Sequence, residues 1–300
     1  MVEITRVSFS PVKPECASCG GLSGEVTPDG ATRRTTYAVE VPPSSLADVL
    51  SALLREPGRP RLTWYGAAGE RIELSGAVLG NWVSKTANLL VEEFDAGPTT
   101  RVLVDLPPHW RAVVWAFAVW RVGACVVLPS HDDAPGSDVV DVVVTDHPDR
   151  FGRSGRDAPV VAVALPALAR TFGSTLPTGA IDAASAVMTY GDAIGWVPPV
   201  DPTAPALTGS SAAGVVTHAD LMGWAGGTAD PGARMLVTTS VARSVAQGTA
   251  RALRDVLCSL RSAGSVVLVD PPTSEAIGSD PARRDRLIET ERVTAVPTGA

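Results

Sequence analysis

A run of small and hydroxyl side chains between residues 207 and 218 is the segment of this sequence best suited to bind an anion. Glycine, serine and threonine allow backbone N–H and hydroxyl groups to wrap around a phosphate. The alternative is a plain connection between a strand and a helix that Thr217 caps. His218 is equally explained by exposure to solvent or by capping. Ser210, Ser211 and exposed backbone N–H groups are the candidate anion contacts.

Gly209 and Gly214 have the glycine spacing of a Walker A loop, but Val215 and Val216 replace its Lys-Ser/Thr pair, so we discard that match. The two lysines of the sequence lie elsewhere, at positions 13 and 85. No other residues have the spacing of a nucleophile elbow, a zinc protease helix, a dinucleotide loop or a metal site. We therefore expect no catalytic residues and no metal ligands.

The elements that must position this loop alternate between helix and strand. Ser44 or Ser45 and Ser75 are placed to cap helices, and the Gly-containing turn 66–69 predicts a hairpin. Continuous apolar runs predict parallel strands covered on both faces. The alternation predicts an α/β fold with mainly parallel sheets and flanking helices in two lobes. Helices are expected at 44–54, 75–94, 110–122, 245–260 and 281–290, and strands at 62–65, 71–74, 101–106, 124–128, 139–144, 160–165, 235–238, 266–269 and 293–296.

Composition divides the chain into four segments. Residues 1–43 lack apolar periodicity and predict a disordered N-terminal extension. Residues 44–170 predict a first α/β lobe, and residues 207–300 predict a second. Between them, residues 171–206 are rich in Gly, Pro, Ala and Asp and predict a loop-rich bridge.

Charge and apolar content limit the classes of partner. The formal net charge is −7, from 25 basic and 32 acidic residues, and no basic run is present. Nucleic acid and anionic membranes are therefore not expected as partners. Residues 1–15 have neither a basic start nor an apolar core of a signal peptide, which predicts a cytoplasmic protein. We expect a protein partner or a small acyl or nucleotide ligand.

Several short motifs follow one another in a recognisable order over residues 59–129. They are Pro60 to Leu62, Glu73 to Leu79, Arg101 to Pro107 and Ala116 to Pro129. In this order they resemble the opening of the adenylate-forming superfamily, which comprises acyl-CoA synthetases, luciferases and the adenylation domains of peptide synthetases. More narrowly, the chain resembles a short actinobacterial AMP-binding-like group.

The resemblance implies that the 207–218 segment matches the phosphate-binding loop of the superfamily, T-S-G-T-T-G-x-P-K-G-V-x-x-T-H. The candidate binding residues that it implies are Thr208, Gly209, Ser210, Ser211, Gly214, Thr217 and His218. The segment is shorter than that loop, and Ala213 stands where its lysine would be. The superfamily's adenine, magnesium and ribose contacts and its catalytic lysine lie further along than Val296. The resemblance therefore implies a fold like the large N-terminal domain of these enzymes but truncated, with an incomplete second lobe.

These departures predict a degenerate protein without independent ligase activity that acts by binding a ligand or a protein. Adenylation brings two anions together, and Mg²⁺ and cationic side chains must offset their repulsion. ATP or AMP with Mg²⁺ is the cofactor that the resemblance allows, and none is required. The alternative is an acyl-CoA ligase, or one subunit of a split enzyme, that uses ATP and a carboxylic acid. A purely structural protein that keeps the fold is a third reading.

Overall fold

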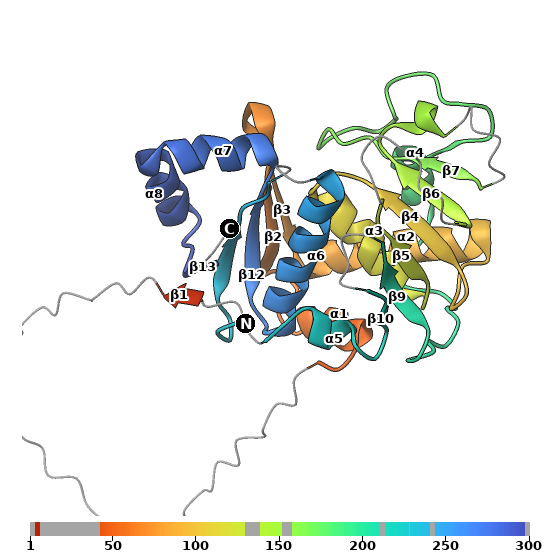
Figure 1. The fold of residues 1–300 in the computed structure, drawn as a ribbon, viewed down its shortest axis with the longest axis horizontal. Coiled ribbons are helices and arrows are strands. Elements are labelled where there is room, and N and C mark those ends of the chain that lie inside the picture. Colours follow the sequence, from red (N-terminus) through yellow and green to blue (C-terminus); the bar gives the residue numbers. More distant parts are fainter. Residues whose placement is uncertain are drawn as a thin grey trace, which may run out of the picture.

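Two β-sheets with helices packed between them form the fold (Figure 1). The computed structural model describes residues 43–129, 139–151, 158–209, 214–227, 229–240 and 244–297, together with the backbone of residues 4–6. No helix in these ranges combines the length and apolar character that a bilayer crossing requires.

The first sheet has six strands and is built from both ends of the chain. Its three central pairings, β13 with β11, β11 with β12 and β12 with β2, are parallel, and an antiparallel strand lies at each edge. The β2–β3 pair confirms the predicted hairpin. In spatial order the strands are β1 (Ile4–Arg6), β13 (Ala295–Pro297), β11 (Arg234–Val237), β12 (Ser265–Val269), β2 (Pro60–Tyr65) and β3 (Arg71–Ser75).

The second sheet has seven strands, all parallel except the edge strand β10. Its strands are short and rich in valine, and the central ones are buried on both faces, as expected for a covered parallel sheet. In spatial order the strands are β10 (Val216–Thr217), β9 (Pro205–Thr208), β5 (Cys125–Val127), β4 (Arg101–Asp105), β6 (Val142–Thr145), β7 (Val160–Ala162) and β8 (Ile181–Asp182).

The main hydrophobic core lies between the two sheets and is filled by helices. Ser75 caps α2, as predicted, and Ser45 caps the first helix in a capping box. Every residue of α3 from Trp110 to Trp120 is buried, because this helix packs against its neighbouring helices and against β4 and β5. These helices are α1 (Leu46–Leu53), α2 (Gly76–Phe94), α3 (Trp110–Arg121) and α6 (Val245–Arg261).

Two smaller apolar clusters cover the outer faces of the sheets. The cluster on the six-stranded sheet includes Ile277 of α7 (Pro271–Ser279) and Leu287 of α8 (Pro281–Thr290). The sequence analysis expected α8 but not α7, which begins with Pro271 and Pro272. Both prolines occupy the first helical turn, where a missing N–H costs nothing.

Sheet membership does not follow the predicted lobes. The hairpin 60–75 belongs to the first predicted lobe, yet it pairs with β12 from the second. Ile4–Arg6 forms a strand, which contradicts the expected absence of structure at those three residues. Residues 1–3 and 7–42 lie outside the described residues, so the prediction there is untested.

The predicted bridge, residues 171–206, is mostly irregular and contains only short elements: β8, α4 (Ala183–Ala186), one 3₁₀ turn (Val187–Thr189) and the first residues of β9. Two polar side chains of α2 contact this segment. Asn88 donates to the carbonyls of Gly191 and Ala193 at 3.2 and 2.9 Å. Lys85 forms an ion pair with Asp192 at 2.9 Å.

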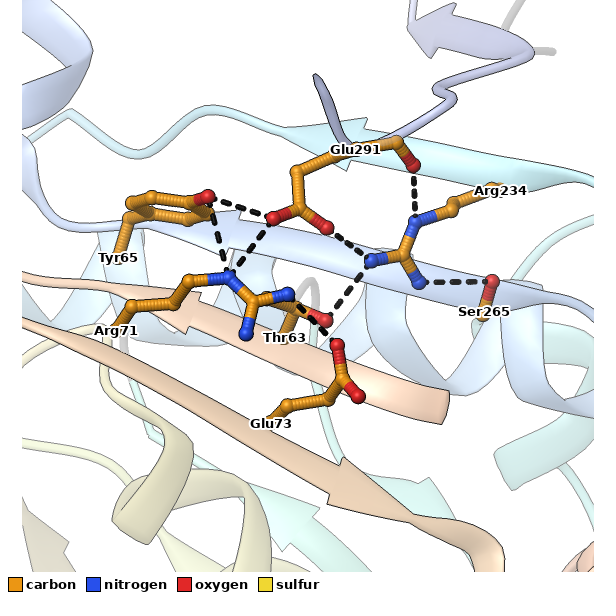
Figure 2. Close-up of polar contacts among 7 residues, drawn as sticks. All are labelled: Thr63, Tyr65, Arg71, Glu73, Arg234, Ser265 and Glu291. Carbon is orange, nitrogen blue, oxygen red and sulfur yellow. Dashed lines mark hydrogen bonds and ion pairs between the residues drawn. The ribbon is translucent and has the colours of Figure 1, made fainter. Parts of the chain in front are cut away.

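A polar network ties the end of α8 to the outer face of the six-stranded sheet (Figure 2). The Glu291 side chain is 4% exposed and forms ion pairs with Arg71 and Arg234. The Tyr65 hydroxyl donates to Glu291 Oε1 at 2.6 Å. Burial opposes ionisation of Glu291, but hydrogen bonds from Arg71, Tyr65 and Arg234 outweigh it and lower the pKa to about 2.

Candidate functional site

The predicted anion-binding loop connects the two strands of an antiparallel pair at the edge of the seven-stranded sheet. Thr208 ends β9 and is almost fully buried, and Gly209 follows it with φ +121°. A side chain at Gly209 would collide with the backbone carbonyl of Leu128. Gly214, with φ +110°, closes the other side of the connection. Ser210 and Ser211 lie outside the described residues, so anion binding by this loop stays a prediction.

Thr217 and His218 lie at the opposite end of this strand pair. The His218 N–H donates to the Ala204 carbonyl, just before β9 begins. From there to Gly209, an extended chain spans about 16 Å. His218 therefore cannot contact a phosphate held at Gly209, and among the described residues the structure does not bring Thr217 and His218 together with Gly209.

The local roles of these two residues also differ from the prediction. The short helix α5 (Leu221–Trp224) begins after Asp220, so Thr217 is not its N-cap. Instead, Thr217 Oγ1 donates to Asp220 Oδ2 at 2.7 Å. His218 is partly buried, and burial lowers its pKa although the backbone of Gly123 and Ala124 opposes that shift.

A pocket of about 490 Å³ lies where the carboxyl ends of strands from both sheets meet. Ligands bind at this edge of open α/β sheets as a general rule. We call it the interlayer pocket. Its walls come from the segments that follow β2, β4, β7 and β12, and none of its lining residues is Lys or Arg. They are Trp64, Gly66, Ala67, Glu70, Pro107, Pro108, His109, Leu165, Pro166, Asp270, Pro271 and Pro272.

One corner of the interlayer pocket is polar. Trp64 is 3% exposed, and its Nε1–H is buried without a hydrogen-bond partner. A buried N–H without a partner is costly, so it marks a place for an acceptor. Glu70 lies beside it: a Cβ added at Gly66 would be 3.1 Å from both Trp64 Nε1 and Glu70 Oε2. Gly66 therefore keeps the space between this donor and this carboxylate open.

Two helix N-termini border the interlayer pocket, and both are capped from within the chain. His109 Nδ1 accepts from the Arg111 N–H at 3.1 Å at the start of α3. Asp270 accepts from the Thr273 N–H at 2.7 Å at the start of α7, and from the Ala67 N–H. A cap of this kind uses the N–H groups that would otherwise bind an anion.

His109 is expected to remain neutral across the physiological range. Burial, and to a smaller extent the charge of Arg111, lower the pKa of His109 from 6.5 to about 3. Because Nδ1 accepts a hydrogen bond, the proton resides on Nε2. We expect ¹H–¹⁵N spectra to show the Nε2–H tautomer, with no titration of this ring between pH 5 and 8.

The control for this prediction is the protein unfolded in urea, in which the same ring should titrate near its ordinary pKa of about 6.5. Since the folded pKa lies below the ordinary one, folding favours the neutral ring. His109 therefore stabilises the fold fully above about pH 6.5 and less as the pH falls toward 3. Titration of the folded ring near pH 6.5 would contradict the assigned burial.

The sequence analysis missed the interlayer pocket because its walls come from four segments that are far apart in the chain. One signal was present. Pro107-Pro108 and Pro271-Pro272 each follow a buried strand and precede a helix, and parallel strands place such junctions at one edge of a sheet.

Comparison with known proteins places the chain in a family. No family model matches it. A Mycobacterium tuberculosis protein described as a TIGR03089 family protein is 38% identical over 256 residues, which cover 83% of this chain and 96% of that protein. The chain belongs to the TIGR03089 family.

Solved structures similar to this TIGR03089 protein are adenylate-forming enzymes. An acyl-CoA synthetase from Brucella canis superposes with a TM-score of 0.59 at 16% identity, over 78% of this chain and 45% of the enzyme. An amide bond synthetase from Marinactinospora thermotolerans gives 0.56 at 16% identity, over 83% and 47%. Acetoacetyl-CoA synthetase from Streptomyces lividans gives 0.54 at 19% identity, over 76% and 38%.

At these identities the likeness shows the fold alone. It confirms the predicted resemblance to the adenylate-forming superfamily and the predicted α/β fold class. The TIGR03089 chain spans less than half the length of each of these enzymes.

Proposed function

We propose that this TIGR03089 protein binds a small, largely apolar ligand in the interlayer pocket and does not form an acyl-adenylate by itself. The observation that carries the proposal is a cavity of about 490 Å³ with a buried, unpartnered Trp64 Nε1–H in its wall. Cavities of this size, mostly apolar and with few polar groups, are typical of small-molecule sites.

The distribution of cations supports the absence of adenylation. Adenylation must hold a carboxylate against a phosphate, and cationic side chains offset that repulsion. Lys85, the one lysine within the described residues, is bound to Asp192 and to the carbonyl of Tyr190. Ala213 occupies the position of the superfamily's loop lysine in the sequence.

Two measurements test this proposal. We expect purified protein to catalyse no ATP–pyrophosphate exchange with C4 to C8 carboxylic acids. We also expect at least one of the C6 acid, amide and amine to raise the thermal unfolding midpoint, since a ligand that binds only the folded state stabilises it. If none of these three compounds raises the midpoint, the ligand-binding proposal fails and a protein partner becomes the better one.

A ligase, or a ligase subunit, is the second candidate function. One observation favours it: β9 and β4 are separated only by β5, so Gly209 at the end of β9 and the interlayer pocket lie on the same edge of one sheet. That spacing is about 10 Å, close enough for one extended ligand to reach both. Pyrophosphate exchange by the purified chain would favour this candidate and contradict the proposal.

A further inference from the structure

We infer that the interlayer pocket selects a ligand whose head group is uncharged and can accept a hydrogen bond, such as an amide or an alcohol, over a carboxylate or an amine. This inference rests on the proposed function and adds the chemical class of the ligand. It follows from three properties of the pocket wall: a free donor, two carboxylates, and blocked helix N-termini.

The free donor requires an acceptor on the ligand. Trp64 Nε1 is buried and has no partner, and it lies 3.1 Å from the position that a Cβ at Gly66 would occupy. An ammonium group carries no acceptor, so it would leave this donor unsatisfied. The ligand head group must therefore contain a carbonyl, hydroxyl or similar oxygen.

The charges near that corner disfavour an anionic oxygen. Glu70 and Asp270 both line the pocket, and no Lys or Arg does. Arg111 interacts with Glu70 and offsets its charge in part. Its guanidinium lies against the Trp110 ring at 4.4 Å and is not among the lining residues. A carboxylate ligand would thus lie near two carboxylates in a partly desolvated site, and no cation among the lining residues would balance its charge.

The helix N-termini, where anions often bind, cannot stabilise an anionic ligand here. Pro271 and Pro272 begin α7 and have no N–H, and the first available donor, Thr273, is held by Asp270. Pro107 and Pro108 precede α3 in the same way, and His109 accepts from Arg111 N. The backbone around the pocket therefore supplies little positive potential.

The carboxylate of Glu70 adds a complementary acceptor. Its Oε1 accepts from the Ala167 N–H at 3.2 Å, while Oε2 faces the space that Gly66 leaves open. Trp64 and Glu70 thus present a donor and an acceptor side by side. An amide, which carries both groups, matches this pair, and so does an alcohol.

Isothermal titration with three probes that share one tail tests the inference: hexanamide, hexanoate and hexylamine at pH 7. We expect hexanamide to bind at least ten-fold more tightly than either charged probe. Tighter binding of hexanoate or hexylamine would overturn the inference and leave the proposed function standing. Absence of binding by all three would overturn both.

Two pairs of variants assign the binding to this corner. Trp64→Phe should weaken hexanamide binding about ten-fold, the effect of one hydrogen bond, whereas Trp196→Phe, the same change at a 70% exposed site, should not. Gly66→Ala should also weaken binding, and Gly58→Ala, where an added Cβ meets nothing within 4 Å, should leave it unchanged. Equal affinities within both pairs would overturn the assignment. If Trp64→Phe fails to fold, equal affinities of Gly66→Ala and Gly58→Ala would overturn it on their own.

Discussion

Replacing Glu291 with glutamine is expected to lower the free energy of unfolding by about 3 kcal/mol, because the substitution leaves two arginines without their buried counter-charge. Glu291 is 4% exposed and is shared between Arg71 and Arg234. Arg71 is 42% exposed, so water compensates part of its loss, and we place the effect at the lower end of the range for broken buried pairs. Urea denaturation measures it.

The matched control is Glu289→Gln, on the exposed side of the same helix, which should change stability by less than about 0.5 kcal/mol. The pH profile provides a second readout. Because the folded pKa of Glu291 is about 2 and its ordinary value is 4.5, its stabilisation is complete above pH 4.5 and is lost as the pH falls toward 2. The difference between wild type and Glu291→Gln should therefore shrink over this window, and a constant difference would contradict the network.

Gly209→Ala is expected to destabilise the protein by about 4 kcal/mol, through both backbone strain and overpacking. Gly209 has φ +121°, which side chains with a Cβ rarely adopt, and the new methyl group would collide with the Leu128 carbonyl. Denaturant unfolding measures the effect. Shifting β9 away from β5 would relieve the collision but would break the pairing of Thr208 with Val127.

Gly214→Ala separates the two causes. Gly214 also has a positive φ, +110°, but an added Cβ meets nothing within 4 Å. It should retain the strain and lack the collision, so its cost should be lower by about 1–3 kcal/mol. Equal costs at the two glycines would show that the contact with Leu128 is unimportant.

Local patterns predicted the elements of this fold well. A helix was expected at 110–122, and α3 spans Trp110–Arg121. Its aromatic and aliphatic side chains cover several faces, and a helix of this kind is buried between other elements. The hairpin at 66–69 was equally visible, because a turn between two apolar runs is a short-range feature.

Long-range partners were not predictable in the same way. Nothing in the sequence around Leu62 indicates that its neighbour in the sheet is Val266. The sequence analysis therefore divided the chain into two consecutive lobes, although one sheet contains strands from both. The candidate site suffered from the same limit. The predicted residues were contiguous in sequence but the hairpin separates them, whereas Trp64, Glu70, His109 and Asp270 meet only after both sheets have formed.

The pairing of β2 with β12 has a consequence for synthesis on the ribosome. Val266 emerges about 200 residues after Leu62, which at ordinary elongation rates is a delay of about 10–40 s. During that time the apolar hairpin is complete but its parallel partner does not yet exist, and an unpaired strand edge of this kind promotes aggregation. The nascent chain should therefore depend on chaperones until its last strands are made, and a stop codon placed before β12 should yield an insoluble product.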